Sequence, residues 1–258
     1  MKIAICVKAV PEAAAPRRID PQSKRLDRSG ELTLNPFDVY AVEEGLRQRH
    51  AAGGGEVVVV SMGPERAAEA LRRALALGAD RAVLVSDDAL AGSDILATSR
   101  VLAKALEREQ PDLILLGQQG EESVGAVLWA ALAERLRLPC VSQAAELTIA
   151  GGMATVERQT EFGYDTIGAP LPAVIAVSDA INQPRYPSLK GIMAAKSKPL
   201  ERLTLAELGL DANEVGEAGS RTTVRALGEP SKRGGARIVE DGDGVRAILD
   251  FLVERSLV

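Results

Sequence analysis

Three segments could bring backbone N–H groups to a phosphate, because each follows a short apolar run and contains glycine or proline. They are Val7–Pro11, Ser61–Pro64 and Gly117–Gly125. Glycine lets the backbone approach an anion closely, and the first turn of a helix attracts negative charge. With Asn35–Asp38 at another helix start, these segments predict a nucleotide site. Plain tight connections are the alternative, and the acidic pair Glu121-Glu122 favours that alternative unless both side chains turn outward.

A second segment with unusual chemistry is Asn182–Lys198, NQPRYPSLKGIMAAKSK. Its two prolines hold the chain extended, which lowers the entropy lost when a contact loop becomes ordered. Tyr186 and Leu189 are large side chains among polar neighbours, and a protruding leucine of this kind suits a pocket on a partner protein. A linker that packs on its own domain explains the same residues equally well.

Residue types that carry catalysis or bind metals are scarce. The sequence has no G-x-x-x-x-G-K-[ST], no G-x-G-x-x-G after a predicted strand and no G-x-S-x-G motif, which excludes three common enzyme classes. The one histidine, His50, is expected to face solvent at a helix end. Cys6 and Cys140 stand among apolar residues without metal-type spacing and are expected in the core. We therefore expect no catalytic side chain and no metal site.

Short apolar runs alternate with helical patterns over the first 140 residues. Continuous apolar runs of this length are typical of strands buried on both faces of a parallel sheet. The predicted strands are Lys2–Lys8, Glu56–Ser61, Ala82–Ser86 and Leu113–Gly117. The predicted helices are Asn35–His50, Pro64–Leu77, Ser93–Glu109 and Ser123–Leu136. This order predicts a doubly wound α/β fold with a mainly parallel sheet.

The pattern changes after residue 140. Glu146–Ile149 and Thr155–Gln159 flank Gly151-Gly152 and predict a β-hairpin. Pro172–Val177 reads as a buried strand that returns to the main sheet.

The last quarter of the chain has weak periodicity, with one short helix expected at Leu203–Leu208. Residues 216–235 are rich in Gly, Ser, Arg and Thr and predict an extended arm without a core of its own. Gly244–Arg255 predicts an amphipathic helix with an apolar face. Such an arm and helix need a surface to cover, either on their own domain or on another chain.

The overall composition excludes several partners. The chain has 258 residues and a formal net charge of −5, and this acidity argues against nucleic acid. A membrane helix needs about 20 apolar residues, whereas the longest apolar run here is about nine, which predicts no membrane insertion. The chain opens without a charged leader before a long apolar block, so we expect a cytoplasmic protein.

Several stretches occur in the same order as in one known family. These stretches are Ile3–Val10, Leu34–Asp38, Ala41–Glu44, Gly78–Ala82, Val156–Ala176 and Asn182–Lys196. On these residues the chain resembles the beta subunit of electron-transfer flavoprotein over almost its full length. The most specific stretch begins at Val156 and keeps the basic Arg158 and the acidic Glu161 of the family signature, while it departs at Phe162 and Asp165.

The resemblance implies a heterodimer with an alpha subunit, in which one FAD lies mainly on alpha near the subunit interface. The beta subunit then contributes a Rossmann-like domain of the adenine-nucleotide-binding type, expected over residues 1–184, which usually holds AMP. Residues 185–258 are expected to form a recognition loop and an arm that packs on alpha. The complex would carry electrons from acyl-CoA dehydrogenase-type flavin dehydrogenases to a quinone oxidoreductase, in fatty acid oxidation, with no catalytic side chain on beta.

The family's functional positions carry over as follows. The nucleotide-binding residues implied by the resemblance are Cys6, Asn35, Pro36, Phe37, Asp38, Met62, Gly117, Gln118, Gln119, Gly120, Ser123, Gly125, Ala126 and Val127. The partner-docking residues are Tyr186, Leu189, Ile192 and Met193, with Leu189 at the family's anchor position. Where the family places a polar pair before the helix, this chain has Ser123–Leu128, so backbone N–H groups are left to bind a phosphate. The same departure gives no support for a second FAD in place of AMP, as in bifurcating members.

Two other classes of protein remain as alternatives. A stand-alone adenine-nucleotide-binding protein of the stress-protein type has a similar fold and would bind nucleotide without a partner or an arm. An adenylating or pyrophosphatase-type enzyme is disfavoured, because the sequence lacks a catalytic phosphate motif and a usable histidine.

Overall fold

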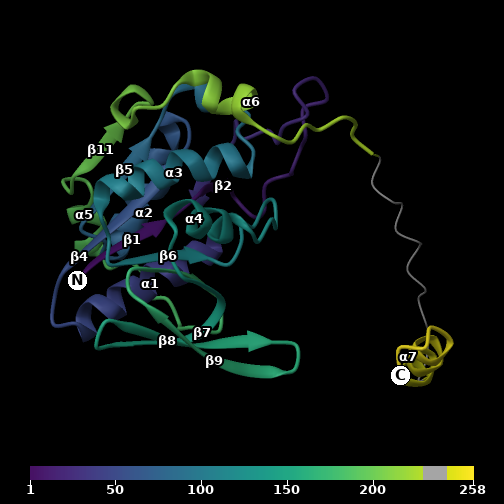
Figure 1. Cartoon of the computed structure of the whole chain (residues 1–258). Helices are drawn as coiled ribbons and strands as arrows, with labels where there is room; N and C mark the ends of the chain where they lie inside the picture. The colour runs from purple at the N-terminus through teal and green to yellow at the C-terminus, as the bar shows by residue number, and fades with distance from the viewer. Residues whose placement is uncertain (229–242) are drawn as a thin grey trace. The chain divides into compact units, whose positions relative to one another are not determined.

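The apolar runs form neighbouring strands of one sheet, as Figure 1 shows for the computed structural model, which describes residues 1–228 and 243–258. In order across the sheet, the strands are β11 (Leu200–Leu203), β5 (Arg81–Val85), β4 (Glu56–Met62), β1 (Lys2–Cys6), β6 (Leu113–Gly117), β10 (Ala173–Val177), β7 (Cys140–Ala150), β8 (Met153–Thr160) and β9 (Gly163–Pro170). All pairs from β11 to β7 are parallel, whereas β8 is antiparallel to β7 and to β9. The predicted α/β fold with a mainly parallel, Rossmann-like sheet is therefore confirmed.

The helices follow the strands along the chain. The α-helices are α1 (Pro36–Ala51), α2 (Ala68–Leu77), α3 (Ile95–Glu109), α4 (Leu128–Leu136), α5 (Leu189–Ala195), α6 (Gly216–Gly219) and α7 (Gly244–Glu254). Short 3-10 turns lie at Glu65–Ala67, Asp88–Leu90, Ala206–Leu208 and Ala212–Glu214. A separate two-stranded antiparallel sheet, which the sequence does not predict, pairs β2 (Ala9–Pro11) with β3 (Leu32–Leu34).

Helices cover both faces of the sheet, which explains why its central strands are apolar throughout. Successive side chains of a strand point to opposite faces. In β1, Ile3 and Ile5 belong to a core cluster with residues of α1 and α2. Ala4 and Cys6 belong to a second cluster with residues of α3 and α4. Each face of the sheet therefore has its own aliphatic core, and the fold has three layers.

The chain reverses its winding direction at β1. The connections through α1 and α2 add β4 and β5 on one side of β1, with both helices on one face. The connection through α3 then places β6 on the other side of β1, with α3 on the opposite face. The segments that follow β1 and β6 therefore diverge, and a doubly wound sheet has its ligand crevice at such a point.

The predicted hairpin is confirmed and is longer than expected. Gly151 and Gly152 connect β7 and β8 and both have positive φ values, 58° and 76°. Two residues with positive φ fit the twist of a two-residue hairpin, and glycine adopts this conformation without a steric penalty. A third strand, β9, extends the antiparallel part of the sheet, and the sequence does not predict it. The strand expected near Pro172–Val177 is β10, which lies between β6 and β7.

Residues after the α5 segment add to the main sheet. β11, which the sequence does not predict, pairs with β5 in parallel. The helix expected at Leu203–Leu208 is only a short 3-10 turn. The buried side chains that this region contributes to the α3 side of the core are Leu203, Leu205, Leu208, Leu210 and Val215. Residues 1–224 form one compact unit and residues 225–258 a second. The proposed division of the chain into a domain (1–184) and a partner-binding arm (185–258) stays a prediction.

The predicted start of the fourth helix is wrong. The sequence places it at Ser123, whereas α4 begins at Leu128. Val124 and Ala126 have positive φ values, 48° and 46°, which a right-handed helix cannot include. A smaller difference occurs at α3, which begins at Ile95 because Asp94 accepts a hydrogen bond from the backbone N–H of Ala97.

The burial predicted from the sequence is correct for Cys6 and His50 but wrong for Cys140. Cys6 is buried in the sheet, and His50 is exposed in the last turn of α1, as expected. Cys140 is exposed, which contradicts its expected place in the core. It is the first residue of β7, so its apolar sequence neighbours do not enclose it.

The C-terminal unit contains the predicted amphipathic helix. α7 covers Gly244–Glu254, and its apolar side chains Val245, Ile248 and Leu249 are exposed. The expected arm over residues 216–235 extends beyond residue 228, and that part lies outside the described residues.

Gly117 carries a testable consequence of this packing. A Cβ atom at Gly117 would lie 2.5 Å from the carbonyl carbon of Phe37 and 2.6 Å from the Asp38 Oδ1 atom. Gly117→Ala therefore forces α1 away from β6, and we expect it to lower the free energy of unfolding by about 2 kcal/mol or more. Urea unfolding checks this, with Gly30→Ala as the control because nothing lies within 4 Å of the Cβ position there. Equal stability of the two variants would contradict the prediction.

Candidate functional site

A cleft of about 590 Å³ lies at the carboxyl ends of β1, β4 and β6. Its walls include the segments that follow these strands, namely Val7–Ala9, Met62–Pro64 and Gly117–Gln119. This is the point where the winding of the sheet reverses. The cleft therefore occupies the position in which open α/β sheets bind their ligands.

The structure brings most of the predicted nucleotide-binding residues together. Those that line the cleft are Cys6, Asn35, Asp38, Met62, Gly117, Gln118, Gln119, Gly120, Ser123, Gly125, Ala126 and Val127. Pro36 and Phe37 do not line it, because they form the first turn of α1, with the Phe37 backbone behind Gly117. Binding of a nucleotide by these residues stays a prediction.

Asn35 connects the two loops that diverge from β1 and β6. Its backbone N–H donates to the carbonyl of Lys8 (2.9 Å), and its Nδ2 donates to the carbonyl of Gln119 (2.9 Å). Its Oδ1 accepts from the backbone N–H of Glu121 (3.0 Å). Asn35 occupies the N-cap position of α1 as expected, but its side chain makes no capping hydrogen bond to a backbone N–H of the helix. Its function in the structure is to fix the geometry of the cleft wall.

Asp38 is a buried carboxyl group at the base of the cleft. Its Oδ2 accepts from the backbone N–H of Lys8 at 2.7 Å. Burial raises the pKa of Asp38 to about 7, against the lowering effect of hydrogen bonds from Asn35 and from the backbone N–H groups of Lys8 and Gly117. Asp38 therefore joins the first turn of α1 to the ends of both β1 and β6, and it changes charge near neutral pH.

Cys6 is the neighbour of this carboxyl group at the end of β1. Burial, with a smaller contribution from the charge of Asp38, raises the pKa of the Cys6 thiol to about 12. The thiol is therefore protonated at neutral pH and is not a nucleophile. This agrees with the expectation that Cys6 is an apolar wall residue.

The loop before α4 has an unusual backbone. Val124 and Ala126 are in the left-handed region, and a β-branched residue is rare there. Within residues 1–228 and 243–258, the backbone N–H groups of Gly125, Ala126 and Val127 have no hydrogen-bond acceptor. Backbone in sparsely populated regions is concentrated at ligand sites, and alternating backbone conformations of this kind direct successive N–H groups toward one anion. The loop therefore fits a phosphate group at the N-terminus of α4.

Of the acidic pair in this loop, Glu122 turns inward, whereas Glu121 is 37% exposed and forms an ion pair with Arg17. The Glu122 side chain is 2% exposed and forms ion pairs with Lys8 Nζ (2.5 Å) and with the Arg28 guanidinium. Burial raises the pKa of Glu122, but hydrogen bonds and charges from Arg28 and Lys8 outweigh burial and hold it below its usual range. Two cations therefore neutralise Glu122, and both also line the cleft. The carboxylate does not repel a phosphate as an unpaired one would.

Part of the cleft wall comes from residues that sequence reasoning missed. Arg28 belongs to an irregular segment, and Thr222 lies about 100 residues beyond the last strand of the cleft. Asp94 accepts hydrogen bonds from the backbone N–H groups of Arg221 (2.7 Å) and Thr222 (2.9 Å), which brings this distant segment to the cleft. A run of basic residues between residues 17 and 28 is the one sequence signal that points to the rim.

The docking segment, which we define as Asn182–Lys198, exposes its large apolar side chains. Tyr186 is 95% exposed, Leu189 78% and Met193 60%, and Ile192 is 45% exposed. The segment is extended only to Ser188, which caps α5 by accepting from the backbone N–H of Gly191 (3.0 Å). Leu189 is thus the first residue of a short helix. All four side chains are exposed, while their role in docking stays a prediction.

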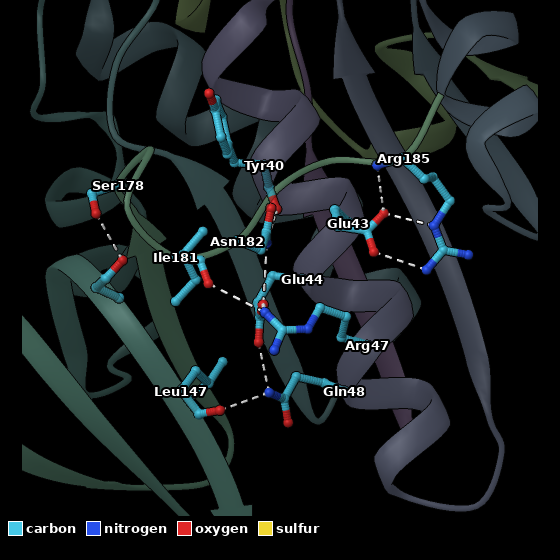
Figure 2. A network of polar contacts seen from close by, with 11 residues as sticks. Tyr40, Glu43, Glu44, Arg47, Gln48, Leu147, Ser178, Ile181, Asn182 and Arg185 are labelled. Carbon is cyan, nitrogen blue, oxygen red and sulfur yellow. Dashed lines mark hydrogen bonds and ion pairs between the residues drawn. The ribbon is translucent and has the colours of Figure 1, made fainter. Parts of the chain in front are cut away.

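A polar network holds the start of the docking segment on α1 (Figure 2). Arg185 Nε and Nη2 donate to the two Glu43 oxygens at 2.7 and 2.8 Å, and Asn182 Nδ2 donates to the carbonyl of Tyr40 (3.1 Å) and to Glu44 (3.2 Å). Bidentate arginine–carboxylate contacts fix geometry as well as adding energy. The docking segment is therefore positioned by the same helix whose first turn lines the nucleotide cleft.

The described part of the chain contains neither a metal-type cluster nor a membrane-spanning helix. No group of three or more His, Cys, Asp or Glu residues there is arranged to hold a metal ion. No helix among the same residues is long and apolar enough to cross a membrane.

The fold and the cleft define a doubly wound, Rossmann-like α/β protein with a strand-end cleft of the kind that binds nucleotides. Residues 24–208 match the family model described as "Electron transfer flavoprotein domain". The chain is 41% identical over 263 residues to the electron transfer flavoprotein subunit beta of Mycobacterium bovis, which covers 99% of both chains. The chain therefore belongs to the electron transfer flavoprotein beta subunit family, whose members are electron-carrier subunits that pair with an alpha subunit.

Relatives with lower sequence identity also align with almost the whole chain. The electron transfer flavoprotein subunit beta of Thermoanaerobacterium thermosaccharolyticum is 39% identical, over 99% of this chain and 97% of its own length. The "Caffeyl-CoA reductase-Etf complex subunit CarD" of Acetobacterium woodii is 36% identical over the same shares. The similarity thus includes the docking segment and the C-terminal unit as well as the sheet.

The buried Asp38 predicts a pH dependence of stability. Because its pKa is raised in the folded state, the folded protein binds a proton that the unfolded chain releases near pH 4. The contribution of Asp38 to stability is therefore fully present below about pH 4, is lost as the pH rises from there to about 7, and no longer changes above the folded pKa. Between pH 5.5 and 8 we expect a loss of about 2 kcal/mol in the free energy of unfolding.

Asp38→Asn should remove this slope, because asparagine does not titrate. Urea unfolding at several pH values from 5.5 to 8 measures it, with the exposed Asp179→Asn as the control. A slope that survives in Asp38→Asn would show that another group causes the pH dependence.

Proposed function

We propose that this chain is the docking and scaffold subunit of a heterodimer that carries electrons from acyl-CoA dehydrogenase-type flavin dehydrogenases to a quinone oxidoreductase. One FAD is held mainly by the alpha subunit at the interface, and the complex acts in the cytoplasm, in fatty acid oxidation. The observation that carries this proposal is the docking segment. Its side chains Tyr186, Leu189 and Met193 are exposed, while Arg185 and Asn182 hold the segment on α1.

This arrangement suits partner binding rather than chemistry on the chain itself. An exposed apolar side chain on a segment with fixed geometry loses little entropy when it enters a partner's pocket. The cleft supplies no activated nucleophile, because its buried thiol, Cys6, is protonated. The support for the electron-carrier role is therefore a surface that is organised for transient contact.

We propose that the cleft holds AMP as a structural nucleotide. Gly125, Ala126 and Val127 would contact the phosphate through their backbone N–H groups. Lys8 and Arg28, which also form ion pairs with Glu122, would offset part of the negative charge of the phosphate. Asn35 and Gln118 line the remaining polar wall. Bound in this way, the nucleotide would join the loops after β1 and β6 and the start of α4.

A specific observation favours one other function. All the residues that line the cleft belong to the unit formed by residues 1–224, so the site is complete without a partner chain. A stand-alone adenine-nucleotide-binding protein of the stress-protein type would have the same property. The two functions differ in whether a flavin-containing heterodimer forms.

The first test is co-expression with the candidate alpha subunit of the same organism. We expect a purified heterodimer with a visible flavin spectrum and one FAD, and denaturing extraction should release AMP in addition. A colourless chain that does not pair with alpha and binds adenine nucleotide alone would contradict the electron-carrier function. A heterodimer with FAD but without AMP would contradict only the assignment of the cleft.

Leu189→Ala tests the docking role. The substitution removes most of an exposed side chain from the start of α5, so folding and FAD content should not change. We expect kcat/KM for electron acceptance from an acyl-CoA dehydrogenase to fall about ten-fold, because the loss of an anchor side chain weakens the complex. Leu96→Ala on α3, on the other face of the sheet, is the control. Unchanged transfer kinetics in Leu189→Ala would remove Leu189 from the docking surface.

A further inference from the structure

A groove of about 990 Å³ lies beside the docking segment. Its wall is formed by β3, by α1, by α2 and by residues 184–196. The apolar part includes Leu34, Val39, Ala76 and Leu77, which pack against the core on the α1 side of the sheet. The groove is therefore a fixed apolar surface that the main sheet supports, and nothing in the proposed AMP site uses it.

The charged part of the groove has one sign only. Arg72, Arg73, Arg185 and Lys196 line it, and no carboxylate of the described residues does. The whole chain has a net charge of −5, so this concentration of cations opposes the overall balance. Arg73 and Arg185 form ion pairs with glutamates outside the lining.

The other two cations have no carboxylate partner among residues 1–228 and 243–258. Arg72 Nη1 donates to the carbonyls of Ala195 (2.6 Å) and Lys198 (2.7 Å), which orients the guanidinium without neutralising it. Lys196 is exposed at the end of α5. A half-buried Arg72 and an exposed Lys196 beside an apolar floor favour a partner that carries carboxylates.

The groove is continuous with the docking residues. Tyr186 and Ile192 line it and also belong to the surface that presents Leu189. A protein that receives Leu189 therefore also covers the mouth of the groove. Binding-energy hot spots of two partners tend to pair across an interface, with each side filling a pocket of the other.

We propose that this groove receives an apolar side chain flanked by carboxylates from the docking surface of the electron-donating flavin dehydrogenase. The inference rests on the proposed function, because it names the second half of the same contact. Leu189 enters the dehydrogenase, and a side chain of the dehydrogenase enters the groove over Val39, Ala76 and Leu77. Its carboxylates then meet Arg72 and Lys196.

Two variants of the flavin-loaded heterodimer test the groove without touching Leu189. Ala76→Leu fills the apolar floor, and Lys196→Glu reverses a charge at the rim. The probe is an acyl-CoA dehydrogenase of the same organism, reduced by its acyl-CoA substrate. We expect KM for the heterodimer and the Kd of the complex to rise about ten-fold in Ala76→Leu and about five-fold in Lys196→Glu, with kcat unchanged.

Matched controls carry the same changes elsewhere. Ala51→Leu adds the same side chain at an exposed position at the end of α1, and Lys104→Glu makes the same change of charge on α3, on the other face of the sheet. FAD content and the unfolding temperature confirm that each variant heterodimer is folded. The groove is supported when both test variants weaken binding and both controls do not.

Other outcomes overturn the proposal. Equal effects of Lys196→Glu and Lys104→Glu would show that the net charge of the chain, and not the position of Lys196 at the groove, controls binding. Wild-type kinetics in Ala76→Leu, together with a defect in Leu189→Ala, would leave the docking surface in place and remove the groove from it. Loss of pairing with alpha in Ala76→Leu would assign the groove to the alpha subunit, and altered self-association in sedimentation would assign it to a second copy. Failure of the wild type to accept electrons overturns the proposed function itself.

Discussion

The close contact between the first turn of α1 and the end of β6 is the constraint on which the rest of this structure depends. Gly117 allows that contact because a Cβ atom would meet the Phe37 backbone at 2.5 Å. Asn35 and Asp38 then connect α1 to the segments after β1 and β6 by side-chain hydrogen bonds. Because its start is fixed in this way, the N-terminal end of α1 determines the position of one wall of the cleft. Its middle positions the docking segment, through the contacts of Glu43 and Glu44 in Figure 2.

The two surfaces that α1 connects have different electrostatic designs. In the cleft, the buried Glu122 forms ion pairs with Lys8 and Arg28, so the two cations are held in place and partly neutralised before any ligand arrives. Beside the docking segment, Arg72 and Lys196 line a groove to which the described part of the chain contributes no carboxylate. Cations that are already held in place suit a ligand that stays bound, because little rearrangement accompanies binding. An unbalanced surface suits a partner that associates quickly and leaves, because long-range attraction raises the association rate.

Local patterns predicted most of the sheet, and contacts between distant residues explain what they missed. The strand at Leu113–Gly117 is placed to the residue because its apolar run is buried on both faces. β11 was missed because its pairing with β5 joins residues more than 100 positions apart. The start of α4 was misplaced because Val124 and Ala126 adopt left-handed backbone that their residue types do not indicate. In the cleft, glycines and helix starts indicate most of the wall, whereas only the run of basic residues between residues 17 and 28 points to Arg28.

The position of β10 determines the order in which the sheet can be completed. β10 lies between β6 and β7, yet it comes after the whole β7–β9 meander in the chain. During synthesis, the apolar edge of β6 is therefore unpaired on one side until Val177 has left the ribosome. A long unpaired apolar edge is a template for wrong pairing, and non-local pairing slows folding. β7 joins the parallel part of the sheet only through β10, so the strand that closes the centre of the sheet is also the strand that leads into the docking segment.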